Sequence, residues 1–355
     1  MSVPADVLGV YTARCAGGDG GGLDRFLPSD RTTYYAYGRQ ALAEALRRIR
    51  VGAGASVLLP GLICREVLAS VAAVGADVVF YGVDDHMRPD VGSLERLPDT
   101  RTRALVVVNY FGWPQPLDEL RPWCRDRGLV LIEDNAHGFL SADDGTLLGH
   151  RGDFGIFSLR KTLALPNGAA LVDNRPAPLI LGARVGADGS PRRSEWRYRA
   201  KAAVKLAMLA GDVRSARAAV RAIGLARRLV SGSALPRPAA DAERAMPAEA
   251  FSPLAGRLLR CVDVDAEIRR RRRLYTEYQR TFATMPEATP LFADLGPAVA
   301  PHSFPFVYHG ANADAFIARS ARSGITVQRW PDLPRAIEAT APEHYRRIML
   351  VPFLW

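Results

Sequence analysis

The segment from Phe157 to Leu171, FSLRKTLALPNGAAL, places a lysine between a short apolar run and a Pro-Asn-Gly turn. Lysine is rarely buried unless another group pairs with it or uses it chemically. Lys161 alone is most simply explained as a solvent-facing loop residue. Ser158, however, stands three residues before it where the apolar run ends. The spacing Ser-x-x-Lys therefore indicates a strand end that carries both a hydroxyl and an amine.

Two other segments carry chemically useful residues at the ends of elements. EDNAHG contains Glu133, Asp134 and His137 directly after an apolar run, and YGRQAL is a glycine turn at Gly38 that opens a helix. Each residue also has a simpler explanation. Asp134 suits a helix N-cap, and a histidine such as His137 is more often a hydrogen-bonded core residue. Only their combination with Lys161 argues for a shared site.

That combination is the set that pyridoxal phosphate needs. The cofactor uses a lysine for its Schiff base, an acid on the pyridinium nitrogen and donors for its phosphate. A helix start with free N–H groups supplies such donors. We therefore expect Lys161, Asp134, Ser158 and the turn at Gly38 to lie at one edge of a sheet.

The elements that would position these residues alternate along the first half of the chain. The pattern predicts helices at 41–49, 64–75 and 117–128, and apolar strands at 56–60, 77–84, 104–112, 129–134, 154–159 and 168–172. Strands alternating with helices favour a mostly parallel sheet covered on both faces. Ligands bind beyond the carboxyl ends of such strands.

The second half of the chain indicates a smaller α+β domain. We predict a linker at 231–247, a helix at 262–282, and then strand, helix and strand at 302–309, 313–324 and 325–330. The expected division is a large domain at 1–245, which includes a glycine-rich N-terminal arm, and a small C-terminal domain at 246–355.

Composition and charge exclude several classes of protein. The chain is 48% hydrophobic and 24% charged, as is usual for a globular protein, and it has no apolar run of membrane-spanning length. Its N-terminus does not resemble a signal peptide, so the cytoplasm is the expected location. The four cysteines form no C-x-x-C pair, and we expect no metal site.

Most of the formal net charge of +10 comes from one segment. Residues 191–230 contain eleven Arg and Lys against two acidic residues, in a pattern that favours one or two helices with a basic face. Solvation of this face is the first interpretation, followed by contact with a membrane surface or an acidic substrate. No nucleic-acid-binding motif accompanies it, so we expect no nucleic-acid partner.

The chain resembles the DegT/StrS sugar aminotransferases, which are pyridoxal-phosphate enzymes of fold type I. The resemblance extends from about Tyr35 to Asp173 and more faintly beyond. It is carried by the segments YGRQALAEAL, GADVVFYGVD, VVNYFGWP, LIEDNAHG, GDFGIFSLRK and NGAAL, in the order of the family.

The resemblance implies a role for each candidate residue. Lys161 matches the Schiff-base lysine and Asp134 the acid on the pyridinium nitrogen. His137 stands where the family has a glutamine beside the ring. The phosphate would be held by Ser158 and by the backbone amides of Gly38 and Arg39.

Some positions depart from the family. The segment that should supply the ring-stacking aromatic is GLICREV, so the stacking residue is Cys64 or comes from Tyr110 or Phe111. Asn167 replaces the glutamate before the glycine pair, and the serine-to-lysine spacing is shorter by two. These departures affect the expected substrate more than the expected cofactor.

From this resemblance we expect a homodimeric aminotransferase that uses pyridoxal 5'-phosphate. It would convert a nucleotide-linked keto sugar to an amino sugar in polysaccharide or natural-product biosynthesis, plausibly with glutamate as amino donor. Two alternatives stay open. One is a dehydratase or lyase on the same scaffold, although dehydratase relatives replace the lysine by histidine. The other is a non-catalytic, membrane-associated scaffold protein of a glycan pathway.

Overall fold

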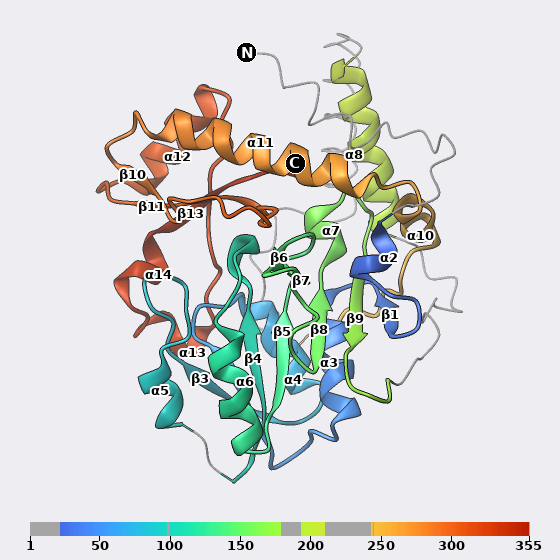
Figure 1. Cartoon of the computed structure of the whole chain (residues 1–355). Helices are drawn as coiled ribbons and strands as arrows, with labels where there is room; N and C mark the ends of the chain where they lie inside the picture. Colours follow the sequence, from blue (N-terminus) through green and yellow to red (C-terminus); the bar gives the residue numbers. More distant parts are fainter. Residues whose placement is uncertain (1–21, 98–99, 179–192, 210–242, 244, 355) are drawn as a thin grey trace, which may run out of the picture.

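The computed structural model of the chain describes residues 22–97, 100–178, 193–209, 243 and 245–354. A seven-stranded sheet and a four-stranded sheet organise this part of the chain (Figure 1). No helix among the described residues is long and apolar enough to cross a membrane. The expected N-terminal arm, most of the linker and the second half of the basic segment 191–230 lie outside the described residues.

The large sheet is mostly parallel. Its strand order is β1-β9-β8-β5-β4-β2-β3, and the five strands from β8 to β3 run parallel, whereas β9 is antiparallel to both its neighbours. The bounds are β1 Thr32–Tyr35, β2 Ser56–Pro60, β3 Asp77–Tyr81, β4 Thr102–Val108, β5 Val130–Asp134, β8 Phe154–Phe157 and β9 Ala169–Asp173.

Helices cover both faces of this sheet, which explains its continuous apolar strands. On one face Val57, Ala104 and Ile132 pack with the helix α3 (Gly38–Arg48). On the other face Leu58 and Leu105 pack with the helix α6 (Leu117–Asp126). Since successive strand residues point to opposite faces, each strand contributes to two apolar clusters.

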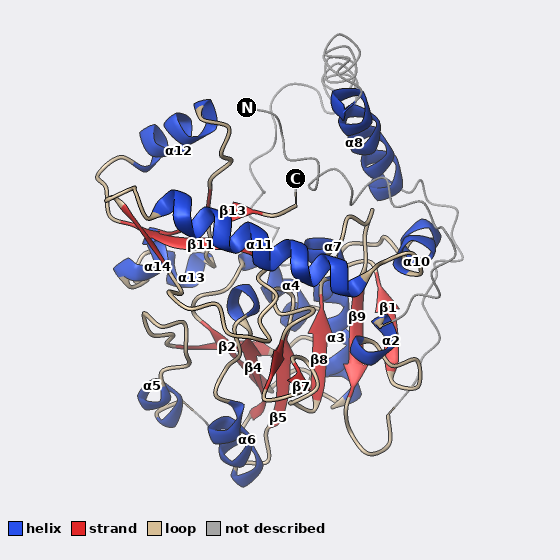
Figure 2. Ribbon diagram, turned by 45° about the horizontal axis from the view of Figure 1, so that its top comes forward, coloured by secondary structure: helices blue, strands red, loops and turns tan. Residues whose placement is uncertain are grey.

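Several short elements connect or cover these strands. They are the helices α2 (Leu23–Phe26), α4 (Leu68–Ala72), α5 (Val91–Glu95) and α7 (Leu159–Thr162), the 3-10 turns η1 (Arg65–Val67) and η2 (Tyr110–Gly112), and the hairpin strands β6 (Ala142–Asp143) and β7 (Thr146–Leu147). The helix α8 (Arg193–Leu209) projects away from the rest of the fold in both views (Figures 1 and 2).

The small sheet is antiparallel, with strand order β10-β11-β13-β12. Its strands are β10 Ala288–Pro290, β11 Ser303–Tyr308, β12 Gln328–Arg329 and β13 Ile348–Pro352, and its helices are α11 Val264–Phe282, α12 Ala313–Arg322, α13 Arg335–Glu338 and α14 Glu343–Arg347. An aromatic cluster that includes Phe282, Phe304 and Phe316 joins α11 and α12 to this sheet. Figure 1 shows α11 running from the small sheet across the top of the large one.

The α/β architecture with a large, mostly parallel sheet and a smaller C-terminal unit is confirmed. Individual bounds differ: the helix expected from Cys64 begins as the 3-10 turn η1, where the Arg65 N–H donates to the Asp332 carbonyl at 2.8 Å. The strands β1 and β13 were not predicted. The boundary at residue 245 stays a prediction, since α10 (Pro253–Leu259) packs into an apolar cluster with Phe157 of β8.

Candidate active site

The carboxyl ends of β5 and β8 bring the chemically useful residues together. Asp134 ends β5 and pairs in register with Ile156 of β8, two residues before Ser158. The start of α3 meets the same edge, because a Cβ atom on Gly38 would lie 3.8 Å from the Ser158 Cβ. The edge therefore combines a strand-end carboxylate, a hydroxyl and a helix start, as the sequence predicted.

Lys161 lies on the single turn of α7, directly after β8. The turn is closed by hydrogen bonds from the Lys161 N–H to the Ser158 carbonyl at 2.9 Å and from the Leu163 N–H to the Leu159 carbonyl at 2.7 Å. The Gly168 carbonyl accepts a hydrogen bond from the Arg160 N–H. The φ angle of Gly168 is +144°, which explains why glycine occupies that turn. The Lys161 Nζ lies 3.3 Å from the His137 Nε2.

Asp134 is 8% exposed and faces the same region as Lys161. Burial raises the pKa of its carboxyl, while the charge of Lys161 and the Ala136 N–H act in the opposite direction. The Oδ1 atom accepts the Ala136 N–H at 2.9 Å. Among the described residues no hydrogen bond involves Oδ2, so this oxygen is available to a bound group.

His137 is 4% exposed and lies in a stack of rings. The His302 ring lies 4.3 Å away at an interplanar angle of 19°, and the Phe111 ring lies 5.5 Å away at 27°. Burial, followed by the charge of Lys161 and then His302, holds the pKa of His137 well below its usual range, so the imidazole is neutral. Its buried Nδ1 has no hydrogen-bond partner in the described structure.

The remaining candidates lie after β2, after β4 and at the start of α3. Cys64 is partly exposed and precedes η1; burial raises the pKa of its thiol, and the charge of Lys161 opposes this. The Tyr110 hydroxyl donates to the Leu62 carbonyl at 2.7 Å, and its ring meets Trp330 edge-on at 5.9 Å. The Arg39 guanidinium lies 5.6 Å from the Tyr37 ring centre. The stacking role of Cys64 or Tyr110 therefore stays a prediction.

Glu133 has a different role from its neighbour Asp134. Its Oε1 accepts the N–H groups of Arg151 and Gly152, each at 2.6 Å, and its Oε2 accepts Gly149 N–H at 3.0 Å and Asn109 Nδ2 at 3.1 Å. The side chain is fully buried. It fixes the loop before β8 and leaves Asp134 as the carboxylate that faces Lys161.

Asn167, the residue before Gly168, anchors segments distant in sequence. Its Nδ2 donates to the Ser194 Oγ at 3.2 Å and to the Ala250 carbonyl at 3.0 Å, and its Oδ1 accepts the Ser252 N–H at 2.9 Å. The base of α8 and the start of α10 are thereby held near the Lys161 turn.

Three residues near the site were missed by sequence reasoning. His302 precedes β11, Trp330 follows β12, and Arg271 lies on α11. The Trp330 ring lies 5.5 Å from that of His137. No local pattern distinguishes these residues from ordinary core positions, since only the packing of the small sheet brings them to Lys161.

The residues present fit pyridoxal 5'-phosphate. Lys161 offers an amine and the Asp134 Oδ2 an acceptor. The first N–H groups of α3, at Gly38 and Arg39, have no partner within the helix, and Gly38 lies beside the Ser158 side chain. The unpaired Nδ1 of buried His137 is also satisfied if a polar group binds next to it.

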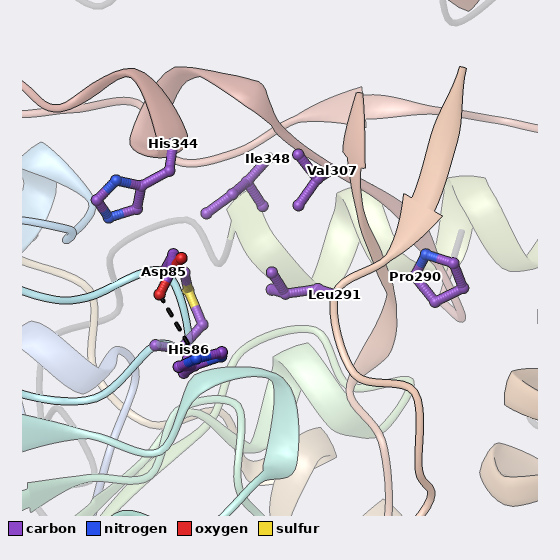
Figure 3. A pocket seen from close by; sticks show the side chains of 8 residues that line it. Asp85, His86, Pro290, Leu291, Val307, His344 and Ile348 are labelled. Carbon is purple, nitrogen blue, oxygen red and sulfur yellow. Dashed lines mark ion pairs between the residues drawn. The ribbon is translucent and has the colours of Figure 1, made fainter. Parts of the chain in front are cut away.

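A separate pocket of about 290 Å³ lies between the loop after β3 and the small sheet (Figure 3). Its polar side chains are Asp85, His86 and His344, and the exposed pair Asp85–His86 has an N–O distance of 3.7 Å. The lining is completed by Met87, Pro290, Leu291, Val307 and Ile348. None of the residues around Lys161 lines it.

Comparison with known proteins identifies relatives of this chain. A family model described as the DegT/DnrJ/EryC1/StrS aminotransferase family matches residues 23–207. An L-glutamine:scyllo-inosose aminotransferase of Streptomyces griseus is 34% identical over 161 residues, which cover 44% of this chain and 38% of that protein. A dTDP-4-dehydro-2,3,6-trideoxy-D-glucose 4-aminotransferase of Saccharopolyspora spinosa is 29% identical over 130 residues, or 36% of this chain and 34% of that protein.

The chain thus aligns with little more than a third of the length of these two curated relatives. A solved DegT DnrJ EryC1 StrS aminotransferase from Brucella abortus superimposes with a TM-score of 0.64 at 17% identity, over 98% of this chain and 90% of that one. This structural likeness concerns the fold alone. It confirms the expected fold type, because the likeness spans both sheets.

Proposed function

This chain belongs to the DegT/DnrJ/EryC1/StrS aminotransferase family, and we propose that it is a pyridoxal-phosphate-dependent aminotransferase. The observation that carries the proposal is the meeting of Lys161 and Asp134 at one edge of the large sheet, beside the start of α3. The reaction replaces the oxygen of a keto group with an amine taken from an amino acid.

Pyridoxal phosphate, when bound, supplies a reactive aldehyde and an electron-withdrawing ring. Lys161 would hold the cofactor through its Nζ and, once released, would act as the base that takes up and returns the substrate proton. Asp134 would keep the ring nitrogen of the cofactor protonated through its Oδ2, which has no partner among the described residues. Ser158 and the N–H groups of Gly38 and Arg39 would hold its phosphate.

His137 and its neighbours shape the site and exclude water from it. The neutral imidazole presents one side to Lys161, and the rings of Phe111, His302 and Trp330 surround it. The Phe111 and His137 rings are buried, and their burial lowers the local dielectric, which would strengthen an interaction between Asp134 and a protonated ring nitrogen.

For the substrate we propose a nucleotide-linked keto sugar, with glutamate as the amino donor. The Saccharopolyspora spinosa relative supports the sugar class, because its name gives a dTDP-linked dehydro sugar as substrate. The Streptomyces griseus relative is named for scyllo-inosose and L-glutamine, so it supports a cyclic keto substrate but not the choice of glutamate. We further propose a homodimer that acts in the cytoplasm, and a division of the chain into domains 1–245 and 246–355.

The test is spectroscopic. The purified chain is mixed with pyridoxal phosphate, and we expect visible absorbance that borohydride bleaches while fixing the cofactor to Lys161, as found by mass spectrometry of the peptides. Addition of glutamate should change the spectrum and release 2-oxoglutarate. A chain that binds no cofactor, or binds it at another lysine, contradicts the proposal.

A further inference from the structure

Arg271 is a fully buried arginine on α11, and each of its three guanidinium nitrogens donates at least one hydrogen bond. Its Nε donates to the Glu267 carboxylate at 2.7 Å, and its Nη1 donates to the carbonyls of Pro301 at 3.0 Å and His302 at 2.9 Å. Its Nη2 donates to the Thr162 carbonyl. One guanidinium thus joins α11, the segment before β11 and the end of α7.

The contact with Thr162 matters because α7 is too short to hold its own shape. A helix of one turn has an unfavourable nucleus, and its last carbonyls have no partner within it. The carbonyl of Thr162, the residue after Lys161, receives the Arg271 guanidinium instead. A cation at this end of a helix is also electrostatically favourable.

A second path leads from Arg271 to the same amine. Arg271 holds the carbonyl of His302, whose N–H donates to the Phe111 carbonyl at 2.8 Å. The His302 ring stacks on His137, and the His137 Nε2 lies 3.3 Å from the Lys161 Nζ. The backbone and the side chain of Lys161 are therefore both restrained by groups that Arg271 fixes.

The neighbouring Arg270 provides an internal comparison. It is 7% exposed and forms two hydrogen bonds to the same Glu267, at 2.7 and 2.8 Å, but its other contact is the Phe353 carbonyl at 3.4 Å. Burial raises the pKa of Glu267, but Arg271 and Arg270 outweigh it and leave the pKa below its usual value, so the acid stays ionised between them. Both arginines form an ion pair with the buried Glu267. Only Arg271 also donates to the carbonyls of Thr162 and His302, whereas Arg270 donates to the Phe353 carbonyl.

We propose that Arg271 is a positioning residue that places the Lys161 amine by fixing the carbonyls of Thr162 and His302 together. The small sheet and α11 then set the geometry of the lysine turn on the large sheet. The inference rests on the proposed function for Lys161, although the clamp itself is a property of the chain without cofactor.

The experiment compares R271K with R270K in the full-length chain. Lysine keeps the positive charge, but its single ammonium cannot span both carbonyls with the geometry of a guanidinium. We expect borohydride trapping of pyridoxal phosphate on Lys161 to slow at least about tenfold in R271K and at most about twofold in R270K, since a misplaced reacting group loses much of its effective concentration. The pH midpoint of the bound cofactor's absorbance should move in R271K alone.

Hydrogen exchange of the cofactor-free proteins keeps the test independent of the cofactor. In the unsubstituted chain the Lys161 and Leu163 amides should exchange as slowly as those in the middle of α11. In R271K these two amides, together with the His302 amide, should exchange at least about tenfold faster, and in R270K they should not. The proposal is overturned if borohydride traps the cofactor at equal rates in R271K and R270K. It is also overturned if, in the unsubstituted chain, the α7 amides exchange much faster than those of α11. If no variant binds cofactor but the exchange pattern holds, the proposed function fails and the clamp stands.

Discussion

Asp134 and Glu133 are adjacent carboxylates whose substitution should affect different quantities. Substitution of Asp134 should lower the rate of the half-reaction, whereas substitution of Glu133 should lower the free energy of unfolding. The first prediction concerns Asp134→Asn. Asparagine has nearly the same shape and can still accept the Ala136 N–H, which is donated to Asp134 Oδ1 at 2.9 Å. The substitution therefore removes the negative charge that faces Lys161 while the backbone at the end of β5 keeps its partner.

The size of the effect follows from the burial of the carboxylate. Asp134 is 8% exposed, so its charge would pair with a protonated ring nitrogen in a poorly hydrated environment. Losing one partner of a buried ion pair costs about 3–5 kcal/mol. At about 1.4 kcal/mol per factor of ten, D134N should lower the rate of the glutamate half-reaction by about 10²- to 10⁴-fold.

The assay is a single-turnover measurement of the change in cofactor absorbance after glutamate is added. Cofactor binding should persist, because Lys161 and the start of α3 are unchanged, and the free energy of unfolding should change by less than about 1 kcal/mol. A half-reaction within about tenfold of the unsubstituted rate would refute the reasoning and make Asp134 a structural residue.

Glu133→Gln is the matched control on the same strand end. The Glu133 carboxylate now accepts hydrogen bonds from four N–H donors. In the glutamine variant an NH₂ group would replace one oxygen and would face two of these donors. Two charged hydrogen bonds at about 1.5–3 kcal/mol each give a loss of about 3–6 kcal/mol in unfolding free energy, measured by urea titration. The half-reaction rate of the folded fraction should stay within a few-fold of the unsubstituted protein.

Three further predictions concern the amine, the histidine stack and α8. Lys161→Ala should abolish borohydride trapping and change the unfolding free energy by less than about 1 kcal/mol; trapping that persists would assign the amine elsewhere. The folded-state pKa values of His137 and His302 lie well below 6.5. As the pH falls below 6.5, the unfolded chain therefore binds more protons than the folded chain. The free energy of unfolding should then drop by up to about 1.4 kcal/mol per pH unit for each histidine. Urea titrations at pH 7 and 5 should show this slope, and H137N/H302N should flatten it. Arg197, Arg199 and Lys201 are exposed basic residues of α8 that should only solvate the helix. The variant R197Q/R199Q/K201Q should therefore change neither the half-reaction nor co-sedimentation with anionic vesicles, and loss of vesicle binding would show a lipid contact.

Local sequence pattern accounts for the large sheet and for the side chains at its edge. Runs such as VLLP at 57–60 are apolar throughout because β2 is buried on both faces, and the same runs end where the carboxyl edge begins. Asp134 and the Lys161 turn could therefore be placed on one edge before any tertiary contact was known. The small sheet was less predictable, because β13 was not assigned and β12 pairs through only Gln328 and Arg329.

Which side chains complete the site was decided only by the tertiary structure. Strand periodicity makes Glu133 and Asp134 point to opposite faces of the sheet. Only the positions of the 149–152 loop and of Lys161 determine that Glu133 accepts hydrogen bonds from backbone N–H groups while Asp134 faces the lysine. His302, Trp330 and Arg271 reach His137 and Thr162 across more than a hundred residues of chain. Such contacts arise from the packing of one sheet against another, and short-range spacing carries no information about that packing.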